Sequence, residues 1–91
     1  MSAKCVFYEG RVQGVGFRWT VKQIASGFDV TGTVRNLPDG RVELHARSDD
    51  PGELDAFLEA IRTSTLAGHI RNEIVSDDPN PEPVRGFQIV H

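Results

Sequence analysis

Two segments of the chain carry apolar residues at the spacing of an α-helix, with strand-like segments between and around them. In the first segment the apolar positions recur every three or four residues: Val21, Ile24, Ala25 and Phe28. In the second the same spacing occurs at Leu54, Phe57, Leu58 and Ile61. Each predicted helix therefore has one apolar face that another layer must cover, and the surrounding strands are the candidates for that layer.

The segments that flank the helices have the composition and periodicity of β-strands. The clearest is "RVELHAR", residues 41–47, in which apolar and polar residues alternate strictly. Its apolar positions are Val42, Leu44 and Ala46. The other predicted strands are residues 4–9, 31–36, 69–76 and 87–90. In the fourth strand we expect Ile70 and Ile74 to lie on the same face.

The order of these elements predicts one fold class. Strand, helix, two strands, helix and strand, followed by a short fifth strand, form a ferredoxin-like α+β sandwich, βαββαβ. Two helices then lie on one face of a mostly antiparallel sheet, and "LPDG", residues 37–40, closes the central hairpin. With 91 residues the chain can build one modest core, so we expect a single domain over 1–91.

The two predicted helices differ at their N-terminal ends. The second has Asp50 as an N-cap, Pro51 in the first turn and Glu53 placed to close a capping box. The first is expected to begin near Gly16 or Phe17, and no Ser, Thr, Asp or Asn stands there to cap it. A bound anion can satisfy the free N–H groups of such a helix.

A glycine-rich loop leads into the uncapped helix in the stretch "YEGRVQGVGFRWTV", residues 8–21. Gly14 and Gly16 allow the backbone to turn its N–H groups inward, and Arg18 adds a planar cation suited to phosphate or carboxylate. The loop lacks the Gly-Lys-Ser/Thr of a Walker motif and the last glycine of a dinucleotide fingerprint. From the residues alone, an anion site and a tight structural turn both stay open.

Three motifs together resemble the acylphosphatase family over nearly the whole chain: "GRVQGVGFR", "VRNLPDGRV" and "GFQIV". The resemblance implies hydrolysis of the carboxyl–phosphate bond of acyl phosphates to a carboxylate and inorganic phosphate, with no metal or cofactor. It makes Arg18 and Asn36 the catalytic residues, with Asn36 orienting the attacking water. It assigns phosphate binding to one loop: Gln13, Gly14, Val15, Gly16, Phe17 and Arg18.

The sequence departs from the pattern of that family at two places. Thr33 stands where an aromatic residue is common, and "TSTLAGHI" lacks the proline often found before the fourth strand. Neither position touches the implied chemistry. We expect both departures to affect packing and stability rather than activity.

Composition limits the partners. The formal net charge is -3 and the pI about 5.5, which argues against a nucleic-acid or membrane-surface binder. The single cysteine, Cys5, cannot form an internal disulfide, and no signal-peptide pattern or long apolar run occurs, so we expect a cytoplasmic protein. The expected partner is a small acyl phosphate, with inorganic phosphate or other anions as product or inhibitor. We expect a monomer.

A non-catalytic module that binds phosphate or carbamoyl phosphate is the alternative function. Modules that resemble this family begin larger carbamoyl-transfer maturation proteins, in which paired-cysteine zinc motifs follow. This chain reaches only His91 and has one cysteine, so we expect the stand-alone enzyme. An RNA-binding module would need aromatic side chains on an exposed sheet face and a basic surface, which this sequence does not offer.

Other possible signals are weaker. Cys5 and Arg11 have the C-x5-R spacing of cysteine-dependent phosphatases, but the residues between them are predicted to form a strand rather than a phosphate loop. The three histidines have no metal-ligand spacing, so we expect no zinc site: His45, His69 and His91. Trp19 is expected to pack on the sheet rather than to line a pocket.

Overall fold

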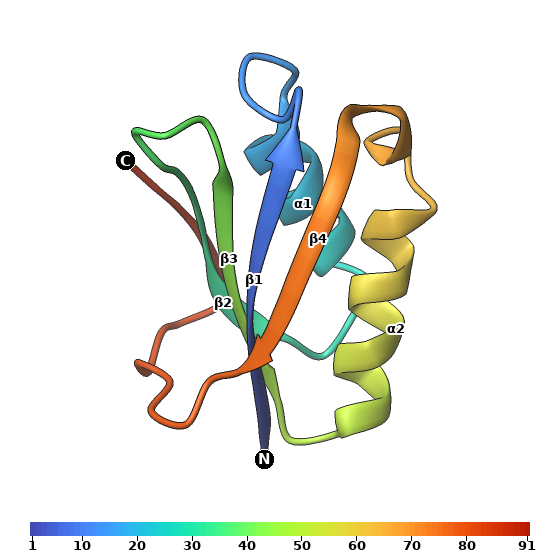
Figure 1. Ribbon diagram of the computed structural model, residues 1–91. Helices are drawn as coiled ribbons and strands as arrows, with labels where there is room; N and C mark the ends of the chain where they lie inside the picture. Colours follow the sequence, from blue (N-terminus) through green and yellow to red (C-terminus); the bar gives the residue numbers. More distant parts are fainter.

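The computed structural model describes all 91 residues and confirms the predicted order of elements (Figure 1). The elements are β1 (Ser2–Gly10), α1 (Phe17–Ala25), β2 (Thr31–Asn36), β3 (Val42–Ser48), α2 (Pro51–Arg62), a short 3-10 helix η1 (Ala67–His69), β4 (Ile70–Asp77) and β5 (Phe87–Val90). Neither α-helix is long and apolar enough to cross a membrane.

The five strands form one mixed sheet with the order β4-β1-β3-β2-β5. All neighbouring pairs are antiparallel except β2 and β5, which run parallel. Both helices lie on one face, where α1 packs over β2 and β5 and α2 over β1 and β3. Three chain segments gather at the same end of the molecule: the loop after β1, the β2–β3 turn and the C-terminus (Figure 1).

The core lies between the sheet and the helices and is built from the predicted apolar faces. The face predicted for the second helix is entirely buried: Leu54, Phe57, Leu58 and Ile61. The alternation predicted for the third strand is confirmed by the burial of Val42, Leu44 and Ala46. The first helix ends at Ala25, so Phe28 lies beyond it, but the Phe28 ring still packs against Phe57 with centroids 6.0 Å apart.

The prediction that Ile70 and Ile74 share a face is wrong. The register between β1 and β4 shifts at Glu9 and Gly10, because β4 contains one extra residue there, Arg71. A β-bulge of this kind reverses the facing of the residues that follow. Ile70 therefore packs against the core, whereas Ile74 lies on the opposite face and is 44% exposed.

The start of α2 confirms the predicted N-cap and corrects the predicted capping box. The Asp50 side chain accepts a hydrogen bond from the Gly52 N–H at 2.8 Å. In a capping box Glu53 would accept from the Asp50 N–H, but that group donates to Ser48 Oγ at 3.1 Å. Glu53 accepts instead from the Asp29 N–H at 3.0 Å. The Glu53 carboxylate thus ties α2 to the connection between α1 and β2.

Candidate functional site

The glycine loop enters α1 through two residues in the left-handed region. Gly14 has φ +78° and Gly16, the N-cap of α1, has φ +76°. No side chain caps the helix, as the sequence predicts. A Cβ at either glycine would meet no atom within 4 Å, so the backbone conformation, and not crowding, requires glycine at these positions.

The backbone N–H groups of this loop have no acceptor within the chain. From Gln13 to Trp19 no main-chain N–H donates a hydrogen bond, and the first to do so is Thr20, to the Gly16 carbonyl at 3.0 Å. These groups lie at the positive end of the α1 dipole. A loop with several free N–H groups at a helix start is suited to hold an anion.

Packing beneath the loop holds the start of α1 in place. Phe17, the first residue of the helix, is buried and packs on the Tyr8 ring of β1 with centroids 5.0 Å apart. Val15 is half-buried against the same core. The side chains of both residues therefore pack against the core, which leaves the main chain of this segment available to a ligand.

Gln13 links the glycine loop to the β2–β3 turn. Its Nε2 donates to the Leu37 carbonyl at 2.8 Å and to the Arg41 carbonyl at 3.0 Å. These carbonyls belong to the turn that follows Asn36, so one side chain fixes the loop relative to the end of β2. The resemblance assigned Gln13 to phosphate binding, and this bridging contact has no local signal in the sequence.

A cavity of about 310 Å³ lies at the mouth of the loop and brings Arg18 and Asn36 together. We call it the glycine-loop cavity; its lining residues are Val12, Gly14, Gly16, Phe17, Arg18, Trp19, Asn36, Ile89 and His91. Four of the six residues assigned to phosphate binding line it, and Gln13 and Val15 do not. The parts of the chain that supply it are the loop between β1 and α1, the start of α1, the end of β2 and the end of β5 with the residue that follows it.

Two polar groups stand out in the glycine-loop cavity. Asn36 Oδ1 is buried and accepts no hydrogen bond from the chain. Leaving a buried amide oxygen unpaired costs about 1–3 kcal/mol, so a ligand or water that donates to it is favoured. Arg18 Nη1 lies 3.2 Å from His91 Nδ1, which places the guanidinium beside the end of β5. His91 at this site was not predicted, because nothing local relates it to residue 18.

Trp19 differs from the prediction that it packs on the sheet. Its side chain is 63% exposed and lines the glycine-loop cavity beside Arg18. The apolar face of α1 is formed by Phe17, Val21 and Ala25, which are buried. Trp19 stands outside that face, where an indole can cover one side of a bound molecule.

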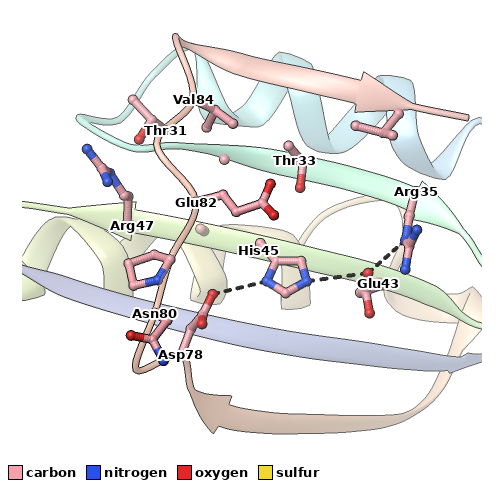
Figure 2. A pocket seen from close by; sticks show the side chains of 14 residues that line it. Thr31, Thr33, Arg35, Glu43, His45, Arg47, Asp78, Asn80, Glu82 and Val84 are labelled. Atoms are coloured by element: carbon pink, nitrogen blue, oxygen red, sulfur yellow. Dashed lines mark hydrogen bonds and ion pairs between the residues drawn. The ribbon is translucent and has the colours of Figure 1, made fainter.

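A second cavity, of about 350 Å³, lies on the sheet face opposite the helices, under the loop that connects β4 to β5 (Figure 2). We call it the open-face cavity. Its walls carry both signs of charge, from Arg35, Arg47, Glu43, Asp78 and Glu82, and His45 lies among them. It shares no lining residue with the glycine-loop cavity.

Cys5 lies on this open face and not in a phosphate loop. It is within β1, and its Sγ is 3.9 Å from His45 Nε2 of β3. Burial, together with the nearby Glu43 and Asp78 carboxylates, raises the pKa of the Cys5 thiol. Cysteine-dependent phosphatases need a lowered thiol pKa, so the C-x5-R spacing with Arg11 does not mark such a site.

Comparison with known proteins gives one consistent match. The sequence model of the family described as acylphosphatase matches residues 4–89. An acylphosphatase of Latilactobacillus sakei is 51% identical over 82 residues, covering 89% of this chain and 88% of that protein. The crystal structure of acylphosphatase from Bacillus subtilis has a TM-score of 0.88 to this fold at 33% identity, with all of both chains covered.

A second kind of solved structure contains a similar fold within a much longer chain. Full-length HypF in its phosphate- and nucleotide-bound form has a TM-score of 0.79 and 25% identity, and the match covers 99% of this chain but 12% of HypF. The similarity therefore extends to a module inside a larger protein as well as to proteins of this length.

Proposed function

This chain belongs to the acylphosphatase family, hydrolases that act on acid anhydrides, and we propose how its residues carry out the reaction. The family converts an acyl phosphate and water to a carboxylate and inorganic phosphate. One observation carries the proposal: the glycine-loop cavity combines free N–H groups, the Arg18 guanidinium and the unpaired amide oxygen of Asn36.

The loop from Gln13 to Arg18 holds the phosphoryl group. Its free N–H groups can donate hydrogen bonds to an anion, and the positive end of the α1 dipole stabilises the negative charge. Arg18 adds a permanent positive charge whose two terminal nitrogens can contact two phosphoryl oxygens at once. Phosphoryl transfer is catalysed mainly by such positioning and charge stabilisation, so these groups are worth most in the transition state.

The leaving group explains why these residues suffice. Cleavage of the acyl O–P bond releases a carboxylate, whose conjugate acid has a pKa of about 4 by analogy with Glu. Such a group departs with the bonding electron pair and needs no proton from the enzyme. An alkoxide from an ordinary phosphate monoester leaves far less readily, and the cavity offers no carboxylic acid to protonate it. The proposed substrates are therefore activated phosphates.

Asn36 holds the attacking water. Its buried Oδ1 accepts a hydrogen bond from that water, and an amide is not a base near neutral pH. As the water oxygen bonds to phosphorus, its proton passes to a phosphoryl oxygen of the substrate. One O–P bond forms, the acyl O–P bond breaks, and the products are dihydrogen phosphate and a carboxylate.

The proposed site is complete within one chain. We propose that residues 1–91 act as one domain and as a monomer, on a small acyl phosphate, with inorganic phosphate competing as the product. The unpaired thiol of Cys5 supports a cytoplasmic location, where thiols stay reduced.

The test is hydrolysis of benzoyl phosphate by wild type, Arg18→Ala and Asn36→Ala. We expect kcat to fall by about 10³-fold or more without the arginine and by about 10²- to 10³-fold without the amide. Arg11→Ala is the matched control: Arg11 is exposed, makes no ion pair and lines neither cavity, so its kcat should equal that of wild type.

Two results would overturn parts of the proposal. Wild-type turnover no higher than the uncatalysed rate would contradict the enzyme, and retained phosphate binding in that case would favour a binding module, the role suggested by the likeness to phosphate-bound HypF. Faster hydrolysis of a simple alkyl phosphate than of benzoyl phosphate would contradict the argument from the leaving group.

A further inference from the structure

Three side chains with metal-ligating atoms meet on the open face of the sheet: Cys5, Glu43 and His45. Their ligand atoms all lie within 4.8 Å of one another. We propose that they bind one zinc ion, with the thiolate, the carboxylate and His45 Nε2 as three ligands and Asp78 orienting the imidazole. This site is separate from the glycine-loop cavity and does not depend on the proposed hydrolysis.

The sheet itself places the three ligands together. Cys5 of β1 lies directly opposite His45 in the antiparallel β1–β3 pair, so the two side chains share one face. Glu43 is two residues from His45 on β3 and therefore points to that same face. Because rigid strands and not loops supply all three, the ligand positions are fixed by backbone pairing.

The distances suit a tetrahedral ion. Tetrahedral geometry with Zn–N and Zn–O bonds of about 2.0–2.1 Å and a Zn–S bond of about 2.3 Å puts the ligand atoms about 3.3–3.6 Å apart. His45 Nε2 is 3.3 Å from Glu43 Oε1 and 3.9 Å from Cys5 Sγ. The nitrogen–oxygen pair already has the required spacing, and the sulfur, 3.9 Å from the nitrogen and within 4.8 Å of the carboxylate oxygen, must move closer to both.

Asp78 prepares the imidazole for this role. Its Oδ2 lies 3.1 Å from His45 Nδ1 (Figure 2). A neutral ring that donates its Nδ1–H to this carboxylate leaves the Nε2 lone pair directed at Glu43 and Cys5. Carboxylates behind zinc-bound histidines act in this way, fixing the tautomer and raising ligand basicity. The Asp78 N–H donates to the Ala3 carbonyl at 3.0 Å, which holds the residue against β1.

Burial and access also fit. Glu43 is 14% exposed and Asp78 17%, so both carboxylates are partly desolvated, while His45 is 40% exposed toward the open-face cavity. That cavity leaves room for a water as the fourth ligand. Arg35 Nε is 2.8 Å from Glu43 Oε1 and must give up this contact or share the carboxylate when the ion binds. The ion replaces the thiol proton, which is released to solvent.

The experiment uses the reduced, metal-free protein titrated with Co²⁺ and then Zn²⁺. We expect a thiolate-to-Co²⁺ charge-transfer band that saturates at one ion per chain and is removed by Zn²⁺. Cys5→Ser should abolish the band, and His45→Gln should weaken Zn²⁺ binding at least tenfold. Asp78→Asn should weaken it about 10- to 100-fold while the band remains, as for a residue that acts through a ligand.

His69→Gln is the matched control, because His69 is half-buried outside both cavities and should leave binding unchanged. The proposal is overturned if wild type shows no thiolate band, or if the band and affinity survive in His45→Gln. If Cys5→Ser does not fold, His45→Gln and Glu43→Gln decide the question with the thiol intact. Hydrolytic activity is not a readout, so failure here leaves the proposed function untouched.

Discussion

Gln13 shows how one side chain can hold two parts of a site in place. Its two hydrogen bonds to the carbonyls of Leu37 and Arg41 join the glycine loop to the turn after Asn36. The distance between the proposed phosphate site and the proposed water site therefore depends on this amide. A small error in that distance is costly, because catalysis by positioning loses much of its effect when groups move by about 1 Å.

Replacing Gln13 by alanine should lower both stability and catalytic efficiency. Loss of two hydrogen bonds of about 0.5–1.5 kcal/mol each predicts a decrease of about 1–3 kcal/mol in the free energy of unfolding. Urea titration and benzoyl phosphate kinetics measure the two effects, and we expect kcat to fall about tenfold or more. The control is Gln23→Ala, which removes an exposed glutamine from α1. Equal kinetics for the two variants would contradict the bridging role.

The candidate site could be predicted from the sequence where its residues lie within one short motif. The uncapped start of α1, the left-handed glycines and Arg18 are neighbours along the chain, so their spacing alone indicates a candidate anion site. The bond between Gln13 and the β2–β3 turn, the contact of Arg18 with His91 and the cluster around His45 join residues far apart in sequence. Such pairs depend on strand order and register, which no local pattern contains.

At the scale of elements, the bulge in β4 decides which side chains support the core. Strand and helix positions followed from periodicity, because each element has one buried face. Arg71 has no partner in β1, so residues on its two sides that regular alternation would place on the same face lie on opposite faces. Nothing in the composition of β4 marks this bulge, so the sequence could not place Ile70 and Ile74 correctly. Gly10, opposite the bulge, accommodates the close approach: a Cβ there would lie 2.5 Å from the His69 carbonyl oxygen.

Substitution by threonine should affect the two isoleucines differently. Threonine keeps a high strand propensity but carries a hydroxyl where isoleucine carries an ethyl group. Ile70→Thr buries a hydroxyl against the core and should lower the free energy of unfolding by about 1–2 kcal/mol. Ile74→Thr, on the open face, should cost at most about 0.5 kcal/mol. Chemical denaturation of both variants measures the difference, and equal losses would contradict the bulge.

At the scale of the whole molecule, the sheet separates two chemistries. The glycine-loop cavity lies at the end of the molecule where the α1 start, the β2 end and the β5 end meet, and the proposed zinc site lies on the face that the helices leave open (Figures 1 and 2). Ion pairs also hold neighbouring elements together. Lys4–Asp77 links β1 to β4, and Arg62–Glu73 links α2 to β4.

Two ion pairs predict loss of stability in acid: Lys4–Asp77 and Arg41–Asp39. Hydrogen bonding and charge attraction by Lys4 lower the pKa of Asp77, and a backbone hydrogen bond from Arg41 lowers the pKa of Asp39. A carboxyl with a folded pKa below its unfolded value stabilises the fold above the unfolded pKa, and this contribution is lost as the pH falls through the folded pKa. The urea midpoint should therefore drop as the pH is lowered below about 4.

The paired variants identify the groups responsible. Asp77→Asn should lower the midpoint at pH 7 and flatten its decline in acid, because the lost contact can no longer be titrated. Asp49→Asn removes a carboxylate that makes no ion pair and should follow the wild-type curve. An Asp77→Asn curve that runs parallel to wild type below about pH 4 would contradict the assignment.

The parallel pairing of β5 with β2 has a consequence for the timing of biosynthesis. Arg18 and Asn36 leave the ribosome early, yet Ile89 and His91 supply one wall of the glycine-loop cavity. The other four strands and both helices come from residues that precede this wall in the chain. A nascent chain would thus carry the arginine and the asparagine in an unfinished cavity until residues 87–91 had been translated.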